Sequence, residues 1–186
     1  MNNIDIIKNN FKESRETNSI SSETILNSIA EAVSKILVMF EKSGKLITCG
    51  NGGSSGDAQH IASEFINRFE IERKSLPAIS LNSDTATLTS IANDYGYKYV
   101  FSKQINAIGK SDDVLVAFTT SGNSENILQA ITAAKSKGIS TILVCGGNGG
   151  EAIKLLDDDD IKIVVPSERT SRIQEIHLII IHSICE

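Results

Sequence analysis

The chain opens with two stretches whose apolar positions recur at helical spacing. The first, over residues 4–17, mixes isoleucine and phenylalanine with charged residues and predicts a short helix. The second carries a longer apolar stripe, formed by Ile25, Ile29, Val33, Ile36, Leu37 and Phe40. Ser21 or Ser22 is suited to cap this second helix, and Gly44 is suited to end it. The stripe predicts core packing, with a helix–helix contact between subunits as the alternative.

From Lys45 onward, short apolar runs alternate with helical patterns. The runs are rich in β-branched residues, which predicts strands buried on both faces, at Leu46–Cys49, Ala78–Leu81, Val114–Phe118, Thr141–Cys145 and Ile161–Val165. Helices are predicted near 55–69, 84–93, 98–108, 124–137, 150–156 and 170–185. This alternation predicts an α/β fold, a three-layer, doubly wound parallel sheet of about five strands preceded by N-terminal helices. Ligands of such sheets bind beyond the carboxyl ends of the strands, so the loops that follow the strands are the candidate sites.

The loop after the first predicted strand reads Asn51-Gly52-Gly53-Ser54 and opens a helix. Glycines allow the backbone to approach a ligand closely, and the free N–H groups of a helix start favour an anion. Farther along this helix, His60 and Glu64 are four residues apart and project from one face, as a base or metal-ligand pair does. The alternative is a glycine-rich turn without a ligand and a surface His–Glu pair.

The loop after the third predicted strand, Thr119-Thr120-Ser121-Gly122-Asn123-Ser124, combines hydroxyl groups with a helix start. A helix cap needs one such side chain, so the cluster predicts a phosphate cradle. Neither a nucleotide P-loop nor a dinucleotide glycine motif is present, so no nucleotide or redox cofactor is expected. Asn93-Asp94-Tyr95-Gly96, by contrast, is typical of a turn.

The last predicted helix carries three polar residues of interest. Gln174 fits a capping box with Ser171. His177 and His182 lie farther along the same helix, and a buried, hydrogen-bonded histidine is the simplest interpretation of either one.

Composition narrows the class of protein. The 186 residues are enough for one domain with a full core, and the net charge of −5 provides no basic footprint for nucleic acid or an anionic membrane. Cys49, Cys145 and Cys185 are odd in number and lie mostly in apolar runs, which indicates buried thiols in a reducing compartment. The first residues lack a signal-peptide pattern, and no apolar run reaches ~20 residues, so we expect a cytoplasmic protein.

In order along the chain, these motifs resemble phosphoheptose isomerases, the sedoheptulose 7-phosphate isomerases of the sugar isomerase (SIS) fold. The motifs are Asn51-Gly52-Gly53-Ser54, Asp57-Ala58-Gln59-His60 with Glu64, Asn93-Asp94-Tyr95-Gly96, Thr120-Ser121-Gly122-Asn123-Ser124, and Arg172-Ile173-Gln174-Glu175-Ile176-His177 with His182. The resemblance covers nearly the whole chain. It departs at Thr119, where the family usually has serine, and the hydroxyl is retained.

The resemblance implies a single, flavodoxin-like SIS domain over residues 1–186, with residues 1–43 as N-terminal helices used in oligomerisation. It implies an aldose–ketose isomerase that converts sedoheptulose 7-phosphate to D-glycero-D-manno-heptose 7-phosphate through an enediol. The product would serve bacterial heptose or lipopolysaccharide synthesis. The expected assembly is a homotetramer with active sites between subunits, without a membrane or nucleic-acid partner.

Site residues follow from the same resemblance. Glu64 would be the catalytic base and His182 its acid partner. Substrate contacts are implied for Asn51, Gly52, Gly53, Ser54, Glu64, Asn93, Asp94, Thr119, Thr120, Ser121, Ser124 and Gln174. One zinc ion per subunit is implied, with His60, Glu64, Gln174 and His182 as ligands. An unbroken helix would separate Gln174 from His182 by roughly 12 Å along its axis, so either the side chains stretch toward each other or different subunits supply them.

A competing hypothesis comes from residues 66–78, which are very similar to a non-catalytic SIS protein that binds the bacterial replication initiator. In that relative, the positions matching Glu64 and His182 do not keep glutamate and histidine. Both are present here, together with the complete Asn51–Ser54 loop, which favours the enzyme. A sugar-phosphate-sensing regulatory module is a third, weaker alternative, because no DNA-binding domain fits in this length.

Overall fold

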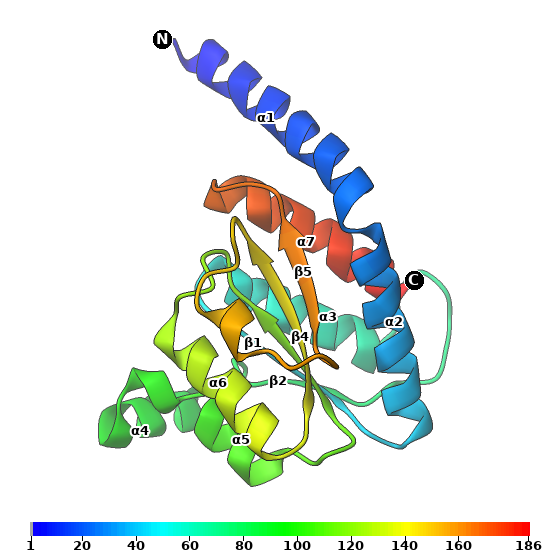
Figure 1. Cartoon of the computed structure of the whole chain (residues 1–186), viewed down its shortest axis with the longest axis vertical. Helices are drawn as coiled ribbons and strands as arrows, with labels where there is room; N and C mark the ends of the chain where they lie inside the picture. Colours follow the sequence, from blue (N-terminus) through cyan, green and yellow to red (C-terminus); the bar gives the residue numbers. More distant parts are fainter. Residues whose placement is uncertain (1) are drawn as a thin grey trace.

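A computed structural model describes residues 2–186, in which a parallel sheet is covered by helices on both faces (Figure 1). The strands are β1 (Leu46–Gly50), β2 (Ala78–Ser80), β3 (Val114–Phe118), β4 (Ser140–Gly146) and β5 (Ile161–Val165). They are all parallel, in the order β2-β1-β3-β4-β5. The predicted α/β class and doubly wound sheet are therefore confirmed.

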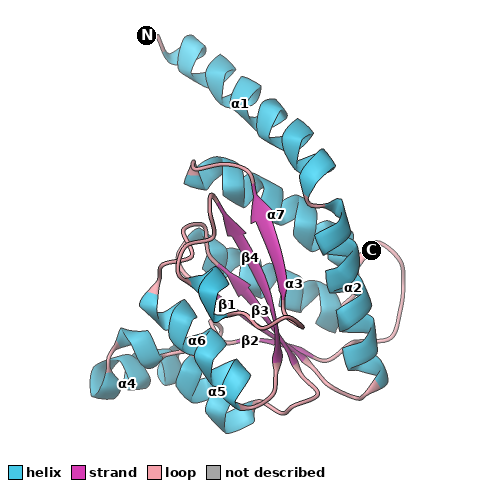
Figure 2. Cartoon of the chain, viewed as in Figure 1, coloured by secondary structure: helices cyan, strands magenta, loops and turns pink. Residues whose placement is uncertain are grey.

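Helices cover both faces of the sheet (Figure 2), and an apolar core lies on each face. The helices are α1 (Asn3–Thr24), α2 (Leu26–Glu41), α3 (Gly53–Ile66), α4 (Thr85–Tyr95), α5 (Ser102–Ile108), α6 (Glu125–Ser136) and α7 (Thr170–Cys185), with 3-10 turns at Tyr97–Tyr99 and Ala152–Leu155. Helices α2, α3 and α7 share one core with the sheet, and α5 and α6 share the other. Side chains alternate between these cores along β1, where Leu46 contributes to the first and Ile47 to the second.

The N-terminal helices differ from the prediction. Ser21 or Ser22 was expected to cap the second helix, but α1 continues to Thr24, and Ile25 stands between the helices with φ −113° and ψ −1°. The amide of Ile25 still donates to Ser21 O at 3.1 Å, so the hydrogen-bonded ladder is barely interrupted and needs no side-chain cap. Helix α1 extends away from the body of the sheet (Figure 1).

The end of α2 is a Schellman motif, in which the residue beyond the cap is left-handed. That residue is Ser43, with φ +61°, and not the predicted Gly44. The amide of Ser43 donates to Phe40 O at 3.0 Å, and the amide of Gly44 donates to Met39 O at 2.9 Å. Gly44 is required for space, because a Cβ there would lie 2.0 Å from Asp112 O.

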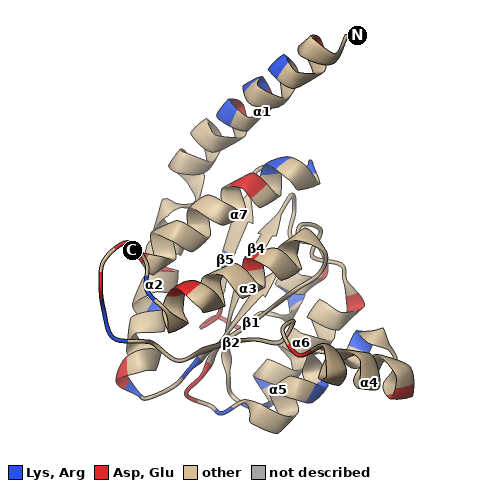
Figure 3. Cartoon of the chain, turned by 180° about the vertical axis from the view of Figure 1, so that it is seen from behind, with Lys and Arg blue, Asp and Glu red and all other residues tan. Residues whose placement is uncertain are grey.

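The strand order places a switch point between β1 and β3, since the chain moves to β2 on one side of β1 and then to β3 on the other. The loops after β1 and β3 meet at this point, where ligands of doubly wound sheets bind. Basic and acidic residues are intermingled on α7 and on the loop after α3 (Figure 3). Among residues 2–186, no helix combines the length and hydropathy needed to cross a membrane.

Candidate active site

A cavity of about 260 Å³ opens at the switch point. Its lining is Asn51, Gly52, Gly53, Ser54, Phe118, Thr119, Thr120, Ser121, Ser124, Thr170 and Gln174. The sequence predicted most of these as substrate contacts. Phe118 ends a buried strand and Thr170 begins α7, and neither position carried a signal beyond its place next to a predicted loop.

Gln174 lies directly over the glycine loop. A Cβ on Gly53 would come within 2.3 Å of Gln174 Nε2, so a side chain there would displace this amide from the loop. The predicted capping box is wrong, because α7 begins at Thr170 and its N-cap is Arg169. Gln174 is thus in the second turn of α7, and its amide faces the loop after β1.

In the hydroxyl-rich loop after β3, some side chains stabilise the loop itself and others line the cavity. Thr119 is buried, and its hydroxyl oxygen accepts a hydrogen bond from the Gly122 amide at 3.1 Å. Gly122 has φ +68°, and a Cβ there would lie 1.9 Å from Gly149 O, so the loop after β4 supports this turn closely. Ser124 is the N-cap of α6, and its side chain lines the cavity. The arrangement presents hydroxyl groups and a helix start to an anion.

A pair of amide side chains joins the two loops. Asn51 Nδ2 donates to Asn126 Oδ1 at 2.8 Å, and Asn126 Nδ2 donates to Asn51 Oδ1 at 2.8 Å. The hydroxyl of Tyr97 also donates to Asn51 Oδ1, at 3.3 Å. Sequence reasoning missed Asn126 and Tyr97, since their link to Asn51 depends on residues far apart in the chain.

A second cluster of predicted residues lies farther along α3. His60 Nε2 is 3.2 Å from Glu64 Oε1, with both side chains partly exposed. The His182 ring on α7 approaches the His60 ring edge-on, with 5.1 Å between centroids and 78° between planes. A carboxylate and two imidazoles from facing helices can accept, donate and relay protons.

The two histidines of α7 have different environments. His177 is fully buried, its Nδ1 lies 3.5 Å from Asp57 Oδ2, and its ring packs against Phe118. The burial of His177 agrees with the prediction, but the predicted hydrogen bond does not, because neither of its ring nitrogens has a hydrogen-bond partner. His182 is exposed and belongs to the His60–Glu64 cluster.

The four implied zinc ligands do not come together in one subunit. His60, Glu64 and His182 are neighbours, and their donor types suit zinc, but Gln174 lies at the glycine loop, near the other end of α3. In the described chain, no three His, Cys, Asp or Glu side chains form a metal-binding group. A single subunit therefore does not fit this ion.

Asn93 and Asp94 occupy the last turn of α4, so the helix continues past the predicted turn and ends at Gly96, with φ +98°. Both residues are exposed, and Asn93 Nδ2 donates to Asp94 Oδ1 at 2.9 Å. They lie outside the residues that line the cavity at the switch point. One subunit does not bring them to the glycine loop.

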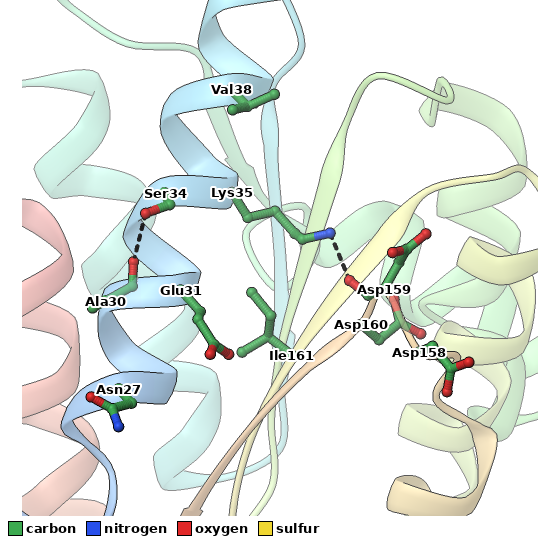
Figure 4. Close-up of a pocket in the computed structure, with 10 residues that line it drawn as sticks. All are labelled: Asn27, Ala30, Glu31, Ser34, Lys35, Val38, Asp158, Asp159, Asp160 and Ile161. Atoms are coloured by element: carbon green, nitrogen blue, oxygen red, sulfur yellow. Dashed lines mark hydrogen bonds between the residues drawn. The ribbon is translucent and has the colours of Figure 1, made fainter.

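Larger hollows lie elsewhere. A groove of about 760 Å³ separates α2 from the turn before β5, and Lys35 Nζ donates across it to Asp159 O at 2.6 Å (Figure 4). Another, of about 660 Å³, runs between α3 and the edge strand β2, and His60 contributes to its wall. Of the cluster, only His60 lines this groove; Glu64 and His182 are not among its lining residues.

Burial changes the ionisation of Cys185 beside this cluster. The pKa of its thiol is raised to about 12, first by desolvation and then by the negative charge of Glu64, while the positive charge of Arg73 opposes the rise. Cys185 is therefore close enough to both Glu64 and Arg73 for their charges to affect its thiol. The buried thiols of Cys49 and Cys145 also have a pKa raised to about 12, in both cases by desolvation.

Comparison with known proteins shows the family of this chain. The model of the SIS domain matches residues 10–146. A phosphoheptose isomerase of Colwellia psychrerythraea is 53% identical over 180 residues, which cover 97% of this chain and 92% of the relative. This chain belongs to the phosphoheptose isomerase family of SIS domain proteins.

Solved structures of phosphoheptose isomerases have the same fold. That from Francisella tularensis has a TM-score of 0.97 and 40% identity, with 100% of this chain and 97% of that chain covered. That from Neisseria gonorrhoeae has a TM-score of 0.92 and 39% identity, with 97% and 95% covered. The resemblance to phosphoheptose isomerases inferred from the motifs is thereby confirmed.

Proposed function

We propose that this chain is an aldose–ketose isomerase that converts sedoheptulose 7-phosphate to D-glycero-D-manno-heptose 7-phosphate. The proposal rests on one observation: His60 on α3 contacts both Glu64, on the same helix, and His182, on the facing helix α7. The chain belongs to the phosphoheptose isomerase family. The two residues expected to act as base and acid are far apart in the chain, and each contacts His60 in the fold.

The chemistry requires one proton to move between neighbouring carbons. Glu64 removes a proton from C1 of the ketose while His182 protonates the carbonyl oxygen at C2, which forms an enediol. Glu64 then returns the proton to C2, and His182 accepts the proton of the C1 hydroxyl as the aldehyde forms. General acid–base catalysis of this kind contributes on the order of 10²–10⁴-fold to a rate.

The cavity at the switch point would hold the phosphorylated end of the sugar. Thr120, Ser121 and Ser124 offer hydroxyl groups beside the start of α6. Gln174 offers an amide group to the sugar hydroxyls, whereas the amide of Asn51 would have to leave its pairing with Asn126 to do so. Asn93 and Asp94 are proposed to complete the contacts from another subunit.

We propose a homotetramer with shared active sites, because the cavity and the Glu64 cluster are separate within one subunit. Gln174 faces Gly53, whereas His182 is more than two helical turns farther along α7. On α1, Ile4, Ile7 and Phe11 share a face and are 58%, 49% and 65% exposed. An apolar face of this kind on a projecting helix supports the use of residues 1–43 in oligomerisation.

Zinc is proposed at the same shared site, one ion per subunit. His60, Glu64 and His182 would hold it together with Gln174 of the partner subunit. The bound ion would supply Lewis-acid polarisation of the sugar oxygens. In one subunit His60 contacts both Glu64 and His182, but these side chains would have to move to hold an ion together.

The cellular role follows from the chemistry proposed. A single SIS domain over residues 1–186, acting in the cytoplasm, would supply a heptose phosphate for lipopolysaccharide or other surface heptose. No redox cofactor takes part, since the isomerisation is internally balanced.

The test is turnover of sedoheptulose 7-phosphate by the purified chain, followed by NMR with and without zinc. We expect Glu64→Gln to lower kcat at least ~100-fold while the fold is retained, because the amide cannot accept the proton. Glu72→Gln, at an exposed glutamate, is the matched control and should leave kcat unchanged.

Two results would contradict the proposal in different ways. Near-normal turnover by Glu64→Gln would exclude Glu64 as the base. Absence of turnover by the folded wild-type chain under every metal condition would favour binding of the replication initiator, which a pull-down with that protein would then test.

A further inference from the structure

The loop of residues 67–77, between α3 and β2, passes the last turns of α7 and places an aromatic ring against His182. The Phe69 ring stacks on the imidazole, with 5.4 Å between centroids and 20° between planes. The His60 ring meets the same imidazole edge-on, with 5.1 Å between centroids. The exposed His182 ring is therefore in contact with two aromatic rings.

The 67–77 loop is fixed to the end of α3 by Arg73. Its Nη2 donates to Glu64 O at 2.7 Å, and its Nη1 donates to Phe65 O at 3.1 Å. These carbonyls lie in the last turn of α3, where helical partners are lacking. The amide of Leu76 adds a bond to Phe65 O at 2.9 Å. Basic and acidic residues both occur along this loop (Figure 3).

Besides stacking on His182, Phe69 is packed against the apolar core. Its side chain is half-buried and packs against the core shared by α2, α3 and α7. A ring fixed in this way restricts the rotamers of the imidazole stacked on it. An unsupported histidine on the exposed face of a helix would instead sample several orientations.

We propose that Phe69 is a positioning residue of the isomerase reaction, and that its ring holds the imidazole of His182 toward His60 and Glu64. The inference rests on the proposed function. Phe69 is not expected to touch the substrate. It acts through His182, and the anchoring of its loop by Arg73 couples it to the backbone of Glu64.

The first experiment compares Phe69→Leu, Phe69→Tyr and Phe69→Trp. Leucine retains an apolar contact with the core but cannot stack, so we expect kcat to fall about tenfold or more while KM changes less than about twofold. Tyrosine and tryptophan keep a stacking ring and should restore kcat to near the wild-type value. Phe40→Leu is the matched control, because Phe40 packs on Phe65, with ring centroids 5.5 Å apart, and takes no part in the His182 contact.

The second experiment measures geometry without turnover. In the full-length protein with labelled histidine, three imidazoles give signals, and His182→Gln assigns one of them. We expect the ring current of Phe69 to displace the His182 ring-proton resonances. This displacement should be lost in Phe69→Leu and kept in Phe69→Tyr and Phe40→Leu.

The outcomes separate this inference from the proposed function. If the wild-type chain does not turn over the substrate, the proposed function fails, and the displaced resonance still tests the stacking. If the wild type is active and Phe69→Leu retains its kcat, the positioning role is wrong. A fall in kcat that tyrosine and tryptophan do not restore, or that Phe40→Leu reproduces, would also overturn it, since it would reflect only a loss of stability.

Discussion

At the scale of single residues, burial decides what the cysteines can do. All three thiols are buried, and desolvation raises the pKa of each to about 12. The thiolate is the reactive form, and it is scarce at any pH well below the pKa. The thiols of the folded chain are therefore expected to be inert toward thiol reagents.

This predicts a contrast between the folded and unfolded protein. At pH 8, the folded chain should react negligibly with a disulfide reagent, and all three thiols should react in guanidinium chloride. As pH rises from about 9 toward 12, the unfolded chain ionises its thiols first, so the free energy of unfolding should decrease over that interval. Rapid labelling of the native chain at pH 8 would contradict the burial of these side chains.

Two residues predicted to contact the substrate already form hydrogen bonds with neighbouring residues of the chain. Thr119 was expected to contact substrate, yet its hydroxyl already accepts the Gly122 amide. Asn51 was expected to do the same, and its amide is paired with that of Asn126. Both residues shape the cavity, and the Ser121 hydroxyl accepts from the Asn123 amide at 3.3 Å, which leaves Thr120 and Ser124 as the side chains most available to an anion.

At the scale of elements, the backbone at the end of α2 is strained at Ser43, and a substitution can relieve this strain. Ser43 has φ +61°, a conformation that disfavours a side chain by roughly 1–2 kcal/mol, and glycine relieves this at some cost in chain entropy. We expect Ser43→Gly to increase the free energy of unfolding by about 0.5–1 kcal/mol, measured by urea denaturation.

The neighbouring glycine is the control. Gly44→Ala should destabilise the chain, because the new Cβ would meet Asp112 O at 2.0 Å. Stabilisation by both substitutions, or by neither, would contradict the Schellman geometry.

At the scale of the whole molecule, the separation of the cavity from the Glu64 cluster predicts complementation between subunits. Glu64→Gln and Gln174→Ala should each be inactive alone. When the two are co-expressed, roughly a quarter of randomly mixed shared sites would combine an intact Glu64 with an intact Gln174 from another copy.

The measurement is the specific activity of the co-purified mixed oligomer, with each single variant as the control. Recovery of about a quarter of the wild-type activity is the expected result. An inactive mixture would mean that each site takes both residues from one subunit. Size-exclusion chromatography with light scattering checks that the oligomer is a tetramer.

Much of the fold follows from local sequence. Short β-branched runs predicted the strands at Val114–Phe118 and Ile161–Val165 with their observed bounds. Only the first is buried on both faces, because β5 lies at the edge of the sheet and exposes Lys162. The order of strands and helices then places the loops after β1 and β3 at one edge, which is why the cavity could be anticipated. The position of the break between α1 and α2 could not be anticipated. Ser21 is a suitable cap by sequence, but the backbone hydrogen bonds continue past it, so no cap is needed there.

The sequence by itself determined most elements of this protein and the order that brings the loops after β1 and β3 together, and the family resemblance proposed Glu64 as base and His182 as acid. Only the tertiary structure decided which side chains meet. It pairs Asn51 with Asn126, seats Gln174 on Gly53, and stacks Phe69 on His182. The physical reason is range: hydropathy periods and helix caps act over a few residues, whereas these contacts depend on how α3, α6, α7 and the 67–77 loop pack around the sheet.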